Sequence, residues 1–104
     1  MSSTFHVIAR YRTKAGATEG VLDALAELAT ASRQEPGNLS YEFFRGIEDD
    51  RQIVILETYR GPEDFELHRQ APHFVEIGAG RILPNLETRT ITTFELPSAG
   101  NAVA

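Results

Sequence analysis

Two kinds of hydrophobic pattern follow one another along this chain, and their order limits how it can fold. Strand-type segments rich in β-branched and aromatic residues cover residues 4–13, 39–45, 52–59 and 87–96. Helical patterns cover residues 17–34 and 62–70, and a short helix is expected at 73–77 after the Ala71-Pro72 break. The order is therefore β-α-β-β-α-β, and the short link at 46–50 implies an antiparallel hairpin. We predict an α+β, ferredoxin-like fold: a four-stranded antiparallel sheet with helices on one face.

Residues 52–59 carry apolar side chains on both faces of the expected strand. One face holds Ile53, Ile55, Glu57 and Tyr59, and the other holds Val54, Leu56 and Thr58. Helices on one side of the sheet leave the second face bare, as an apolar patch larger than monomers usually expose. We therefore predict a homodimer in which two sheets pack face to face and enclose an apolar space. The alternative is that residues 78–86 and the C-terminal tail cover the second face.

Composition narrows the class of protein. With 104 residues, 41% hydrophobic and 24% charged, the chain fits one small globular domain, placed at residues 1–96, with a flexible tail at 97–104. A formal charge of −5 without a basic cluster argues against nucleic-acid and anionic-membrane partners. The absence of cysteine excludes disulfides, cysteine-bound metal clusters and a thiol nucleophile. Since no signal-peptide pattern or membrane-length apolar run is present, we expect a cytoplasmic protein.

Several segments, in order, resemble the antibiotic biosynthesis monooxygenase (ABM) family of dimeric α/β-barrel proteins. The matching pieces are ARYRTKAG at 9–16, EPGNLSYEF at 35–43, ILETY at 55–59, HRQAPHF at 68–74 and ILPNLE at 82–87. The family pattern is E-x-W followed by a helix that ends H-x-x-S/A-x-H-F. Here Tyr59 stands in place of the tryptophan. The positions that haem-degrading relatives use hold Ala9, Tyr59 and a residue near Gly78, so the resemblance does not extend to haem degradation.

Glu57, Tyr59 and His68 are the candidate catalytic residues. Glu57 lies among apolar residues on one face of a strand, where burial should raise its pKa and suit it to act as a general base. The alternative is that Glu57 is a structural carboxylate paired with Arg10 or Arg12. Tyr59 ends the same strand face, where its ring could form an apolar wall of a pocket and its hydroxyl could donate a hydrogen bond. The alternative is that Tyr59 only packs in an interface. His68 lies on the same helical face as Phe65; the family resemblance supports a proton-transfer role, and the alternative, a structural capping or core histidine, stays open.

Four further residues are expected to bind substrate: His73, Phe74, Phe43 and Ile55. His73 begins a helix just after Pro72, where we expect it either to line the entrance of the substrate pocket or to cap that helix. His68 and His73 are five residues apart across the proline, which is not the spacing of a zinc-binding helix, so no metal site is predicted. No glycine-rich loop leads from a strand into a helix, which leaves nucleotide or flavin binding without support, and no cofactor is predicted.

The resemblance implies a cofactor-independent monooxygenase that oxidises a quinol or polycyclic phenol with dioxygen. A base, His68 or Glu57, would remove a phenolic proton in an apolar pocket, and the electron-rich anion would then react with dioxygen. Two alternatives remain open: an isomerase of small hydroxy-ketones, which keeps the base and does not use oxygen, and a non-catalytic dimer that binds a hydrophobic small molecule.

Overall fold

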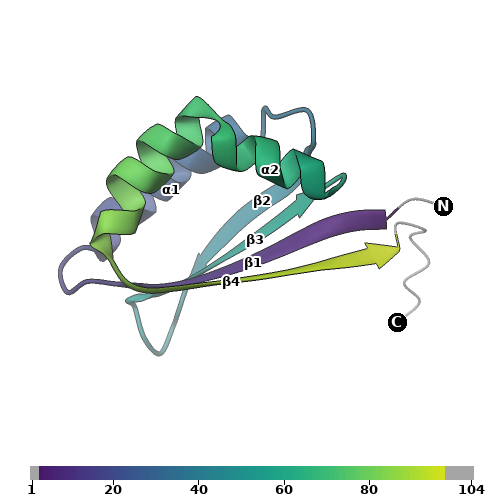
Figure 1. Cartoon of the computed structure of the whole chain (residues 1–104). Helices are drawn as coiled ribbons and strands as arrows, with labels where there is room; N and C mark the ends of the chain where they lie inside the picture. The colour runs from purple at the N-terminus through teal and green to yellow at the C-terminus, as the bar shows by residue number, and fades with distance from the viewer. Residues whose placement is uncertain (1–2, 98–104) are drawn as a thin grey trace.

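The computed structural model describes residues 3–97 and has the expected order of elements (Figure 1). The strands are β1 (Ser3–Thr13), β2 (Asn38–Arg45), β3 (Gln52–Tyr59) and β4 (Leu86–Pro97), and the helices are α1 (Thr18–Ser32), α2 (Pro62–Gln70), the π-type η1 (Phe74–Ile82) and the short 3-10 helix η2 (Leu83–Asn85). Strand β4 extends one residue beyond the predicted strand and includes Pro97, the first residue of the tail predicted at 97–104. The rest of that tail, residues 98–104, lies outside the described residues.

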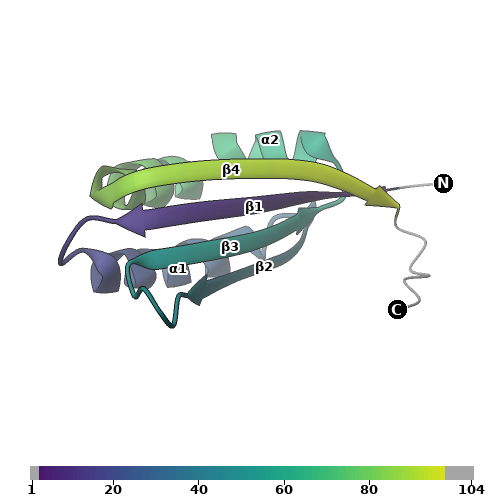
Figure 2. The same cartoon turned by 90° about the horizontal axis from the view of Figure 1, so that it is seen from below.

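The strands form one antiparallel sheet in the order β2-β3-β1-β4. Both helices and η1 lie on one face, and Figure 2 shows the other face with the strands in front of the helices. The α+β, ferredoxin-like prediction is therefore confirmed. No helix within residues 3–97 is long and apolar enough to cross a membrane.

Local sequence explains how the helices begin. Helix α1 buries a stripe that includes Val21, Leu25 and Leu28, and Gly16, with φ 79°, supplies the left-handed turn before it. Thr18 does not cap this helix as its hydroxyl group would suggest; it is buried and shares a 2.6 Å hydrogen bond with the Thr13 hydroxyl. Helix α2 begins at Pro62, because the fixed φ of proline suits the first turn.

The strand alternation fixes which side chains lie under the helices. Ile53, Ile55, Glu57 and Tyr59 on β3 are buried on the helix-bearing face. The predicted apolar space between two sheets therefore cannot contain Glu57 and Tyr59, and this part of the sequence interpretation was wrong. The reason is that the apolar stripe of α1 packs on Ile53 and Ile55, which share a face of β3 with Glu57 and Tyr59. The candidate site therefore lies inside one chain, between the helices and the sheet.

The opposite, open face of the sheet remains apolar and accessible. Leu56 on β3 and Phe94 on β4 are each 38% exposed on this face, and Phe44 and Leu96 are exposed beside them. Residues 78–85, considered as a cover for this face, instead complete η1 and η2 on the helix side, where Ile82 is fully buried in the core with α1. That segment therefore does not cover the open face.

Candidate functional site

Glu57 and Tyr59 form a hydrogen-bonded pair at the end of β3. Their side chains lie two positions apart on one face of the strand, and the Tyr59 hydroxyl donates to Glu57 Oε1 at 2.6 Å. Tyr59 is fully buried and Glu57 is 7% exposed, so of the two only the carboxylate has access to an approaching molecule. The sequence placed both residues in one row correctly, and the structure adds the bond between them.

Burial raises the pKa of Glu57 from 4.5 to about 7. The Tyr59 hydrogen bond works in the opposite direction because it stabilises the carboxylate, whereas the nearby Glu35 charge raises the pKa further. Burial likewise raises the pKa of Tyr59, with the Glu57 charge adding to the effect, so Tyr59 stays a neutral donor. A carboxyl group with a pKa near 7 is suited to accept and release a proton at neutral pH.

His68 projects from α2 toward this pair and is only 2% exposed. Its Nε2 lies 3.8 Å from Glu57 Oε1, and aromatic rings surround it: Phe74 with ring centroids 5.2 Å apart, Tyr59 at 5.6 Å, Phe65 at 6.1 Å. Burial lowers the pKa of His68, partly offset by a hydrogen bond to Glu35, so the imidazole is neutral at pH 7. The structure therefore brings His68, Glu57 and Tyr59 together, with His68 behind Glu57.

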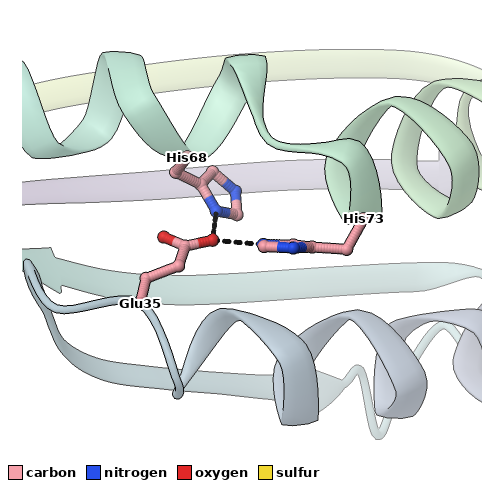
Figure 3. Close-up of side chains that lie close together, drawn as sticks. All are labelled: Glu35, His68 and His73. Atoms are coloured by element: carbon pink, nitrogen blue, oxygen red, sulfur yellow. Dashed lines mark hydrogen bonds and ion pairs between the residues drawn. The ribbon is translucent and has the colours of Figure 1, made fainter.

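Glu35 links the two histidines, as Figure 3 shows. Its Oε2 lies 2.8 Å from His68 Nδ1 and accepts a second, short hydrogen bond from His73 Nε2. The chain break at Ala71-Pro72 makes this possible, because the extended Ala71 ends α2 and turns the backbone so that His73 faces back toward Glu35. Sequence reasoning did not identify Glu35 as a site residue; it appeared only in the segment EPGNLSYEF at the end of the first helix. Its position just before the helix-ending Pro36-Gly37 was the one sequence feature that could have indicated it.

Glu35, His68 and His73 offer three possible metal-ligand atoms that all lie within 4.8 Å of one another. As the side chains stand, however, both imidazoles bond to the same oxygen, and His68 Nδ1 is 2.8 Å from it. Two tetrahedral ligands of one zinc ion lie about 3.3 Å apart, since each bond is about 2.0 Å long. The cluster is therefore arranged as a hydrogen-bonded group.

Arg89 is a second residue that sequence reasoning missed. It lies on β4, paired with Tyr11, and so points to the helix-bearing face. Burial raises the pKa of both Tyr11 and Glu57, and the Arg89 charge lowers both by a smaller amount. Ile91, two positions further along the same face, is 38% exposed although its β1 partner Ala9 is buried. The cover of the helices thus ends between β1 and β4.

The four predicted substrate-binding residues divide into two groups. Phe74 and His73 lie at the site, since both rings pack near His68. Ile55 is fully buried in the main core, and Phe43 packs against the same core from β2. The structure therefore brings the first pair into the candidate site and leaves the second pair as structural residues.

A cavity of about 160 Å³ opens on the other side of His68. Its volume is similar to that of cavities that hold a single benzene ring, so it is too small for a polycyclic molecule. Its lining is mixed in character and consists of Glu35, Pro36, Gly37, Arg60, Asp64, Leu67 and His68. The cavity therefore gives the Glu35 end of the cluster access to solvent.

Comparisons with known proteins agree with this architecture. Residues 4–79 match the model of the family described as antibiotic biosynthesis monooxygenase. A relative, Rv0793 of Mycobacterium tuberculosis, is 30% identical over 79 residues, which is 76% of this chain and 77% of that protein. The solved structure of Rv0793 superposes with a TM-score of 0.78 at 24% identity, covering 96% of this chain and 99% of that one. PA3566 of Pseudomonas aeruginosa gives a TM-score of 0.84 at 25% identity, over 92% and 96% of the two chains.

Proposed function

The chain belongs to the antibiotic biosynthesis monooxygenase family, and on this premise we propose that it is a cofactor-independent monooxygenase that oxidises an electron-rich phenol or quinol with dioxygen. The observation that carries the proposal is the nearly buried Glu57, whose pKa lies near 7 and whose carboxylate is held by Tyr59 beside His68. Such a group serves as a base at neutral pH for a phenolic proton. The substrate itself would supply the electrons that a cofactor usually carries.

In the proposed reaction, Glu57 accepts the proton of a phenolic hydroxyl. The phenolate passes one electron to dioxygen, and the two radicals join through a new carbon–oxygen bond on a ring carbon that bears hydrogen. The resulting peroxide takes a proton from Glu57, which has exchanged its own proton with solvent in the meantime, and eliminates water together with that hydrogen, which leaves a quinone. One oxygen atom stays in the product and the other leaves as water, with every electron supplied by the substrate.

The surroundings of Glu57 support an aromatic substrate. The rings of Phe65 and Phe74 lie beside Tyr59 and His68, and flat aromatic molecules pack well against such side chains. Arg89 lies on β4, which the helices leave uncovered, and its charge would favour a phenolate bound on that side. We place the substrate on this side of Glu57, because Glu57 does not line the cavity beside Glu35.

We also propose that the protein is a homodimer formed through the open sheet face. Leu56 on the inner strand β3 and Phe94 on the edge strand β4 are exposed on that face, and Phe44 and Leu96 add to its apolar side chains. Large apolar side chains gathered on one face are rarely left open to water in a monomer. Because Glu57 faces the helices instead, the dimer would stabilise the sheet rather than complete the carboxylate site.

Oxygen uptake with a panel of quinols and polycyclic phenols tests the proposed activity. We expect the wild-type protein to consume oxygen, and Glu57→Gln to lower kcat about a hundredfold or more, as loss of a general base usually does. Glu66→Gln is the matched control, because Glu66 is an exposed carboxylate on α2. Proton exchange next to a ketone without oxygen uptake would instead identify an isomerase, and binding of the phenols with neither activity would identify a binding protein.

A further inference from the structure

The candidate base lies deep in the chain, yet a continuous series of polar groups connects it to the surface. Glu57 Oε1 lies 3.8 Å from His68 Nε2, and His68 Nδ1 lies 2.8 Å from Glu35 Oε2. The same Glu35 oxygen accepts a short hydrogen bond from His73 Nε2. The side chain of His68 is 2% exposed, that of Glu35 14% and that of His73 24%. Exposure thus increases from His68 outward to His73, whereas Glu57 itself is 7% exposed.

The arrangement at Glu35 fixes which nitrogen of His68 carries the proton. An ionised carboxylate only accepts hydrogen bonds, so the Nδ1 that faces Glu35 must be the N–H of the neutral ring. The other nitrogen, Nε2, then has a free lone pair on the side of Glu57. The same reasoning makes His73 Nε2 a donor to Glu35. Glu35 therefore orients both rings with a single oxygen atom.

We propose that Glu35 and His73 form the exit of a proton path that leads from Glu57 through His68 to solvent. This inference rests on the proposed function, which gives Glu57 a proton to exchange in each turnover. Glu35 is a positioning residue in this path, because it acts on Glu57 only through His68. The cavity lined by Glu35 and His68 and the partly exposed ring of His73 provide the contact with solvent.

The transfer conserves protons and needs no other reactant. Glu57 passes its proton to His68 Nε2 while the Nδ1 proton of His68 moves to Glu35, and Glu35 releases a proton to water in the cavity that it lines. His73 keeps its own Nε2 proton and holds the Glu35 carboxylate in place. The first step requires a closer approach, since 3.8 Å exceeds a hydrogen-bond length; a shift of the carboxylate by about 1 Å suffices. Reprotonation of Glu57 for the peroxide step would follow the same path in reverse.

Nitrogen NMR of the wild-type histidines tests the geometry without any substrate. With uniformly ¹⁵N-labelled protein at pH 8, we expect the long-range proton–nitrogen spectrum to show His68 with its proton on Nδ1. A proton on Nε2 of His68 would overturn the proposal, whatever the activity of the protein. This measurement requires no variant and therefore does not depend on how well a substituted chain folds.

Turnover in dilute, non-imidazole buffer tests the path itself. We expect His73→Ala and Glu35→Gln each to lower kcat about tenfold, within the range of proton-transfer effects, with little change in KM. Added imidazole should restore the rate of His73→Ala in proportion to its concentration and leave the wild type unchanged, which a purely structural role would not produce. If both variants keep the wild-type kcat while Glu57→Gln is inactive, the path is wrong and the proposed function stands. If Glu57→Gln is fully active, the proposed function itself fails.

Discussion

Glu57 makes the folded chain less stable as its carboxyl group ionises. The pKa of this carboxyl rises to about 7 in the folded chain from an ordinary 4.5, so between these values the folded state binds a proton more tightly than the unfolded state. The Glu57 contribution to stability is therefore fully present below about pH 4.5 and is lost as the pH rises through 7. A shift of this size corresponds to about 3 kcal/mol.

Replacing Glu57 with glutamine should remove this pH dependence, because the amide stays neutral. We expect the unfolding free energy of the wild type, minus that of Glu57→Gln, to fall by about 3 kcal/mol between pH 4.5 and pH 8. Urea unfolding at a fixed protein concentration across this range measures the difference. A difference that stays constant with pH would mean that Glu57 ionises like an exposed carboxyl group.

Tyr59 should control the pH at which Glu57 becomes a base. Its hydroxyl stabilises the carboxylate, so Tyr59→Phe should raise the pKa of Glu57 further above 7. A hydrogen bond to a charged group contributes roughly 1.5–3 kcal/mol, which equals a shift of about one pKa unit or more. Carbon NMR titration of the Glu57 carboxyl measures the shift directly, and the acidic limb of the kcat/KM profile should move to higher pH with it. An unchanged or lower pKa would remove Tyr59 from the site.

Individual residues were predicted well where their position depends on local sequence. Glu57 and Tyr59 share a face because a strand alternates, and His68 follows from the helix that begins at Pro62. Glu35 and Arg89 could not be found in this way. Each reaches the site only because the sheet brings together segments far apart in the chain: the end of α1 lies beside α2, and β4 pairs with β1. That kind of proximity leaves no local pattern.

At the scale of elements, strand positions were predicted to within one residue and helix ends less well. The helix expected at residues 17–34 is α1, Thr18–Ser32, and the short helix expected at 73–77 continues as η1 through the glycines to Ile82. Glycines at 78 and 80 suggested a flexible turn. However, Gly78 packs against Phe74, whose ring would lie 3.1 Å from an added Cβ, so the glycine there permits close packing within η1.

Two glycines should respond in opposite ways to replacement by alanine. Gly20 lies inside α1 with open space around its Cα, so Gly20→Ala should stabilise the protein by about 0.5–1 kcal/mol. Gly37 lies where β2 approaches α2, and an added Cβ would be 2.1 Å from Asp64 Cγ. Gly37→Ala should therefore destabilise the protein by about 1–3 kcal/mol, since Asp64 or the start of α2 must move. Urea unfolding compares the two; equal effects would contradict the packing at Gly37.

At the scale of the whole molecule, the sequence predicted the sheet and its layers but placed the active space on the wrong side of β3. Both faces of that strand are apolar, so alternation alone could not decide which face lies under the helices. The core decides it, because Ile53 and Ile55 pack with the α1 stripe. The predicted homodimer stays a prediction, and it concerns the face that carries Leu56.

A charge on the open face should therefore separate the two chains. We expect analytical ultracentrifugation to show a dimer for the wild type and a single folded chain for Leu56→Asp, because an unpaired carboxylate cannot be buried between two apolar sheets. Leu67→Asp is the matched control, since Leu67 is an exposed leucine on α2, in the helix layer. A wild-type monomer at micromolar concentration, or a dimer that persists in Leu56→Asp, would contradict the proposed interface.

Oxygen uptake by protein dialysed against EDTA tests the central claim most directly, because the proposed chemistry requires only Glu57, the substrate and dioxygen. With a reactive quinol, we predict that the treated wild type keeps its full rate and that treated Glu57→Gln is slower by about a hundredfold or more. The account would be contradicted if the two proteins consumed oxygen equally fast. It would also be contradicted if the wild type lost its activity in EDTA and regained it with a transition-metal ion, which would point to Glu35, His68 and His73 as metal ligands.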